Sequence, residues 1–168
     1  MIRRDFVKSL VLVSWMLERP SRLLAKPAEN FPKAPGLTKY IAEFIVNTKY
    51  ENIPEEVVML GKKTILDGFG LALAGSASES GPRIRKYIAT LGCSSGQASI
   101  IGTGMKAPSR FAALANGISI HADDFDDTGS GTHVAAPVLP AAFALCELGR
   151  RSGKDFMLAF HVGVEVEN

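Results

Sequence analysis

The helical spacing of the apolar residues is the feature that most constrains what this chain can fold into. In LTKYIAEFIVN, residues 37–47, apolar side chains recur every three or four positions and share one face of a helix: Leu37, Tyr40, Ile41, Phe44 and Ile45. Similar spacing recurs in five later segments, at about 53–75, 81–92, 108–122, 137–148 and 155–168. The partly β-branched QASIIG predicts at most one short extended piece, near 98–101. We therefore predict an all-α fold for residues 37–168.

Turn and capping residues place the ends of these helices. Pro137 and Pro140 suit the first turn of a helix, where no backbone N–H is needed. Gly75 suits a left-handed end of the second helix, and Ser152 and Asp155 are spaced as a capping box for the last one. The second helix is predicted to turn inward Val57, Gly61, Ile65, Phe69 and Leu73. Its glycines favour close approach of a neighbouring helix, at Gly61, Gly68 and Gly70.

The first 36 residues differ from the rest of the chain. They carry seven Lys or Arg and three Asp or Glu, and they end in a proline-rich linker that closes at Gly36. The start, MIRRDFVKSLVLVSWML, is similar to a twin-arginine export signal. Its apolar run is shorter than the roughly 20 residues of a spanning helix, so we expect no membrane anchor. We expect export to the periplasm, with a plain amino-terminal tail on a cytoplasmic protein as the alternative.

Length and composition bound the remaining possibilities. A chain of 168 residues with 46% hydrophobic and 21% charged residues can form one domain with a core. After residue 36 there is no basic face with interleaved aromatic residues, so we expect no nucleic-acid partner. Cys93 and Cys146 lack metal or redox spacing and are predicted to be free, buried thiols. His161, in an apolar helix, is interpreted as a core or interface histidine. We expect no cofactor.

The acidic segment HADDFDDTGSGTHVAAP, residues 121–137, admits several interpretations. Asp123, Asp124 and Asp127 spell D-D-x-x-D, with which prenyl-diphosphate synthases hold magnesium, but no second acidic motif follows. The segment also resembles the start of a calcium loop, whose twelfth position is Ala135 instead of Glu. We therefore expect no bound metal, and a magnesium-dependent prenyl-diphosphate enzyme is a remote alternative. A solvated polar loop is the plain structural alternative.

Two histidines flank the carboxylates of this segment. His121 precedes them and His133 precedes the next apolar helix, so imidazoles and carboxylates meet where two helices join. This combination can exchange a proton near neutral pH. Helical spacing separates Asp124 from Asp123 and Asp126. We expect Asp124 to orient or protonate an imidazole, with Asp123 and Asp126 turned elsewhere.

The longest patterned stretches resemble one protein family. GTGMKAPSRFAALANGISIHADDFDDT, THVAAPVLPAAFALCELGRRSGKDF and HVGVEVEN are similar to the amino-terminal part of the MmgE/PrpD family, and the likeness runs from about Leu37 to Asn168. The family implies a large helical domain with a smaller lid, a homodimer, and lyase or isomerase activity on small di- or tricarboxylic acids. We therefore expect a truncated helical domain without the lid, inactive by itself. A non-catalytic interaction module is the alternative.

The resemblance also implies roles for individual residues. Asp124 and Thr128 fall on active-site positions of the family, and His133 falls on the histidine that transfers a proton. Thr128 can donate a hydrogen bond to a substrate oxygen. Three further residues are expected to line the site or bind substrate: His121, Asp127 and Asn116. Asp124, Thr128 and His133 should then converge on one concave surface.

Overall fold

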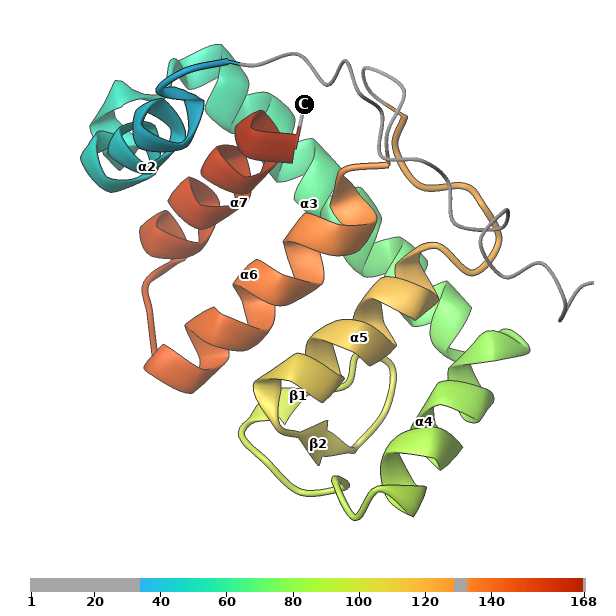
Figure 1. Ribbon diagram of the computed structural model, residues 1–168. Helices are drawn as coiled ribbons and strands as arrows, with labels where there is room; N and C mark the ends of the chain where they lie inside the picture. The colour runs from blue at the N-terminus through green and yellow to red at the C-terminus, as the bar shows by residue number, and fades with distance from the viewer. Residues whose placement is uncertain (1–33, 129–132, 168) are drawn as a thin grey trace, which may run out of the picture. The chain divides into compact units, whose positions relative to one another are not determined.

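Helices dominate the computed structural model, which describes residues 34–128 and 133–167 (Figure 1). The described helices are α2 (Leu37–Asn47), α3 (Glu55–Ser76), α4 (Ser80–Thr90), α5 (Ser109–Ile120), α6 (Ala135–Gly149) and α7 (Gly153–Glu167), with a short 3-10 turn, η2 (Tyr50–Asn52). The predicted all-α fold is confirmed. The extended piece expected near 98–101 is β1 (Ala98–Ser99), which pairs with an unpredicted partner, β2 (Lys106–Ala107), in a small antiparallel hairpin.

The long helix α3 organises the packing, since α4, α5, α6 and α7 all contact it (Figure 1). One buried cluster joins α4, the hairpin and α5 and includes Ile88 and Ile100. A second joins α3, α6 and α7 and includes Leu139 and Phe160. Because α5 also lies against α6, the end of α5 and the start of α6 are brought together. The acidic segment connects these two ends.

Small residues, rather than large ones, form much of the inward face of α3. Its buried residues are Val58, Gly61, Ile65, Gly68, Ala72, Gly75 and Ser76. A Cβ at Gly68 would overlap the Leu139 side chain, and one at Gly75 would overlap the backbone of Ser119. The close approach expected at Gly61 and Gly68 is confirmed, whereas the one expected at Gly70 is wrong, because a Cβ at Gly70 would meet open space. The left-handed end expected at Gly75 is wrong, because this glycine lies inside the helix against α5.

The ends of α6 and α7 test two further predictions. Pro140 lies inside α6 and not in its first turn, so that prediction is wrong. Its missing N–H leaves the Ala136 carbonyl without an intrahelical donor, and this carbonyl faces Gly117 of α5. The capping box is confirmed: Ser152 N donates to Asp155 Oδ2 at 3.0 Å, and Asp155 N donates to Ser152 Oγ at 3.2 Å.

The amino-terminal predictions fall mainly outside the described residues. Residues 1–33 are not described, so the export signal and the boundary at residue 36 stay predictions. Helix α2 begins at Leu37 as expected, and it has no buried residue. None of the helices in the described part of the chain is long and apolar enough to span a membrane. Cys93 and Cys146 are free, as predicted, but half-buried instead of buried.

Candidate functional site

The candidate site begins where α5 ends. His121 follows the last residue of α5, and its N–H donates to the Gly117 carbonyl at 3.1 Å. The chain then turns sharply, since Asp124 has a φ of 57° and donates its N–H to the His121 carbonyl at 3.3 Å. Aspartate tolerates this left-handed conformation better than most residues do. The turn ends the helical spacing of the carboxylates that follow it.

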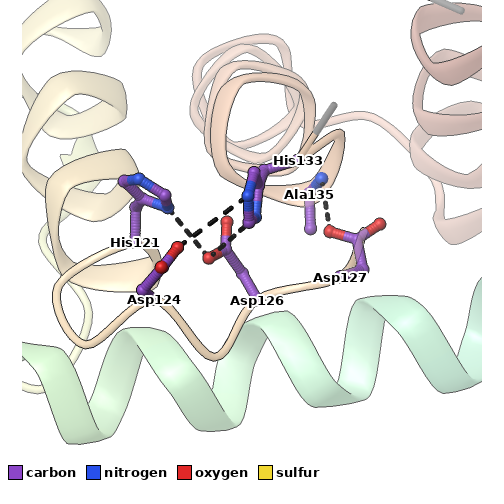
Figure 2. Close-up of polar contacts among 6 residues, drawn as sticks. All are labelled: His121, Asp124, Asp126, Asp127, His133 and Ala135. Atoms are coloured by element: carbon purple, nitrogen blue, oxygen red, sulfur yellow. Dashed lines mark hydrogen bonds and ion pairs between the residues drawn. The ribbon is translucent and has the colours of Figure 1, made fainter. Parts of the chain in front are cut away.

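Asp126 lies at the centre of the site (Figure 2). Its side chain is fully buried, and its Oδ1 accepts a hydrogen bond from His121 Nδ1 at 2.9 Å. His133 Nδ1 lies 3.3 Å from the same oxygen. We predicted that Asp126 would point elsewhere, and that prediction is wrong. It assumed helical spacing after His121, whereas α5 has already ended and Asp124 turns the chain.

The two imidazoles face each other across Asp126. Their ring centroids lie 5.0 Å apart in an edge-to-face arrangement. On its other side, His133 places Nε2 3.8 Å from Asp124 Oδ1, so the contact expected between Asp124 and an imidazole is present. Thr128 is exposed, and both its hydrogen bond to a substrate and its place on a shared concave surface stay predictions.

Two residues predicted to line the site form structural hydrogen bonds. Asp127 Oδ1 accepts from the backbone N–H of Ala135 at 2.9 Å, which caps the start of α6 (Figure 2). Asn116 is fully buried and bonds the hairpin: its Oδ1 accepts from Ile101 N and its Nδ2 donates to Ser99 O, both at 2.9 Å. These bonds fix the start of α6, which follows His133, and tie α5, which precedes His121, to the hairpin. Contact of either residue with a ligand stays a prediction.

The local charges act on His121 in particular. The hydrogen bond that His121 donates to Asp126 raises the pKa of His121, and the negative charges of Asp126 and Asp124 add to this rise. Half of the His121 side chain is exposed, so water screens part of the effect. Two buried atoms of the site form no hydrogen bond with any described residue: Asp126 Oδ2 and His133 Nδ1.

Four side chains of the site could also approach one cation. One donor atom each from His121, Asp124, Asp126 and His133 lies within 4.8 Å of the others. Mixed imidazole and carboxylate donors suit transition metals better than magnesium or calcium, which prefer oxygen ligands. The expectation that the site holds no metal stays a prediction.

An open groove lies beside His121, between α5 and α6. It has a volume of about 490 Å³, and its mainly apolar lining ends at two basic residues, Arg110 and His121. A second hollow, of about 510 Å³, lies between α4 and α5 on the side of Asp123. His121 therefore lies between the Asp126 carboxylate and a space that a small molecule can enter.

Comparisons with known proteins fit the geometry. Residues 39–168 match the MmgE/PrpD N-terminal domain. Cis-aconitate decarboxylase of Mus musculus is 31% identical over 138 residues, which are 79% of this chain and 28% of that protein. The Homo sapiens enzyme of the same name is 34% identical over 79% of this chain and 28% of that protein. The Aspergillus terreus enzyme is 35% identical over 77% of this chain and 28% of that protein. The chain thus spans little more than a quarter of the length of these relatives.

Proposed function

This chain belongs to the MmgE/PrpD family, and from that premise we propose that it carries the proton-transfer part of a lyase or isomerase site for small di- or tricarboxylic acids. The observation that supports this most strongly is the buried Asp126 carboxylate between two imidazoles, with Asp124 beside one of them. A solvated connector would leave its carboxylates in water. This segment instead buries one of them against His121 and His133.

The chemistry follows from the reaction class. Dehydration, decarboxylation and epimerisation of such acids each take a proton from, or deliver one to, a carbon next to a carboxylate or carbonyl. A histidine suits this step because its imidazole changes protonation near neutral pH. In the proposal, His133 exchanges that proton through Nε2, and Asp124 orients the ring from 3.8 Å. Thr128 donates a hydrogen bond to a substrate oxygen.

The proposed site needs positive charge to bind an anionic substrate. Two carboxylates 4 Å apart repel by about 4 kcal/mol at an effective dielectric of 20, so Asp124 and Asp126 alone would reject an anionic substrate. Protonation of His121 offsets one of these charges. The proposal therefore assigns the remaining neutralisation to cationic groups in the part of the family's length that this chain does not span.

Cis-aconitate is the first substrate to test, because the relatives named above are cis-aconitate decarboxylases. Residues 39–168 would replace the matching segment of the mouse enzyme, and the purified chimera would be assayed with cis-aconitate and with other di- and tricarboxylates. We expect turnover of at least one of them. A chimera that melts cooperatively like the mouse enzyme but turns over none would contradict the proposal and favour a non-catalytic interaction module.

A further inference from the structure

The site contains two buried polar atoms that lack a hydrogen-bond partner among the described residues. Asp126 Oδ2 and His133 Nδ1 are both inaccessible to water, and neither forms a hydrogen bond with any described residue. Leaving such a donor or acceptor unpaired destabilises a folded protein substantially, so buried polar groups are usually matched. Two unmatched groups of the same site, one on each side of a carboxylate–imidazole contact, therefore need a physical explanation.

The two groups belong to one close carboxylate–imidazole contact. His133 Nδ1 lies 3.3 Å from Asp126 Oδ1, just beyond the usual N–H···O range of 2.7–3.2 Å. Oδ1 is already occupied by His121 Nδ1 at 2.9 Å. A small rotation of the His133 ring or of the carboxylate would let Asp126 accept from the second imidazole as well, since an ionised carboxylate has acceptor sites on both oxygens. In Figure 2 both rings face the Asp126 carboxylate, from the end of α5 and from the start of α6.

We infer that Asp126 is a positioning residue that binds both imidazoles through Nδ1–H, so that His121 and His133 each present Nε2 to a substrate. An ionised carboxylate only accepts hydrogen bonds, so each ring must place its proton on Nδ1 to bind it. In the neutral ring this leaves the Nε2 lone pair free to take a proton. The inference rests on the proposed function and deepens it, because His121 becomes a second proton-handling group beside His133.

The neighbouring carboxylates do not compete with Asp126 for the two Nδ1 atoms. Asp124 faces His133 Nε2, and Asp127 is engaged at the start of α6. Asp123 lines the separate hollow beside α4, where Arg83 and Glu79 pair with each other. Arg110 lies at the far end of the groove that His121 lines. Among the described residues, Asp126 is thus the one carboxylate positioned to accept from both Nδ1 atoms.

Nitrogen-15 NMR of the histidine rings tests the inference on the chain itself, because it has only three histidines. At a pH where the rings are neutral, we expect the Nδ1–H tautomer at both His121 and His133. His161 serves as the internal reference, since it lies on α7 outside the site. In Asp126→Asn, the new amide can accept from one ring but must donate to the other, so one of the two rings should switch to the Nε2–H tautomer. Asp123→Asn is the matched control and should change neither.

Two results would overturn the inference. One is an Nε2–H tautomer at His133 in the unsubstituted chain, and this result does not depend on whether any variant folds. The other is an unchanged pair of tautomers in an Asp126→Asn chain whose amide spectrum remains native. The experiment needs no substrate, so it is separate from the proposed function: an inactive chimera together with two Nδ1–H tautomers would reject the function and retain the positioning role.

Discussion

At the scale of single residues, two histidines respond to burial and charge in opposite directions. The pKa of His121 is raised, first by its hydrogen bond to Asp126, so this group stabilises the fold below about pH 6.5 and the contribution is lost as pH rises through the higher folded value. The pKa of His161 is lowered by burial. Its ring packs on Gly61, and its buried Nε2 has no hydrogen-bond partner among the described residues.

The lowered pKa of His161 predicts that the contact between α3 and α7 weakens in acid. Because the unfolded chain binds a proton at this residue more readily than the folded chain does, stability falls as pH drops from about 6.5 toward the lower folded pKa. We expect His161→Gln to flatten this part of the stability profile, measured by urea denaturation between about pH 5 and 7. A profile as steep in the variant as in the parent chain would contradict the assignment.

Magnesium and calcium should bind the acidic segment weakly. Of the four donors that approach one another, two are imidazoles, which these hard cations disfavour, and Asp126 already bonds His121. Calorimetric titration should therefore show no binding tighter than about millimolar, the weak end of the range for calcium sites. Micromolar binding that Asp124→Asn abolishes would revive the diphosphate or calcium interpretations.

At the scale of elements, Asn116 ties the hairpin to α5. Replacement by alanine leaves the Ile101 N–H and the Ser99 carbonyl without their partner. At about 1–3 kcal/mol for each of these two unsatisfied groups, Asn116→Ala should lower the free energy of unfolding by roughly 2–6 kcal/mol. Asn47→Ala, at the exposed end of α2, is the control and should change it by less than about 0.5 kcal/mol. Equal changes in the free energy of unfolding for the two substitutions would contradict the structural role of Asn116.

The element scale also shows what the sequence can predict. Apolar periodicity and capping residues located the helices closely: α2 has the predicted bounds, and the Ser152 capping box is present. The inward face of α3 is predicted only in part. Gly61 and Ile65 are buried as expected, but Val57 and Leu73 are exposed, because periodicity favours large side chains whereas much of this face is built on small residues. The central position of Asp126 cannot be predicted from helical spacing, because the chain makes a left-handed turn at Asp124 that the spacing of the residues does not indicate.

At the scale of the whole molecule, the described chain presents many large apolar side chains to solvent. Examples are Tyr40 and Val46 on α2 and Leu60 and Leu66 on α3, which are 63–80% exposed. Exposed apolar surface of this kind is typical of interaction sites. The homodimer that the family resemblance implies would bury surface of this kind, and it stays a prediction.

We therefore expect this chain to self-associate. Sedimentation velocity should show an average mass that rises with protein concentration, and Leu66→Gln should reduce the rise without lowering the melting temperature, because Leu66 is 75% exposed. Leu139→Ala, at a fully buried position, is the contrasting variant and should destabilise the fold by about 2–5 kcal/mol. A monodisperse monomer at every concentration would contradict this expectation.

The most direct test of the central claim, that His133 transfers the proton, is the turnover of His133→Ala in the chimera with the mouse enzyme. We predict a fall in kcat of about 10²- to 10⁴-fold, the usual contribution of a general acid–base group, with little change in KM. Asp123→Asn, a nearby carboxylate outside the His–Asp cluster, should keep nearly full activity. Full activity of His133→Ala in a folded chimera would contradict the account and leave residues 121–137 as a polar connector between α5 and α6.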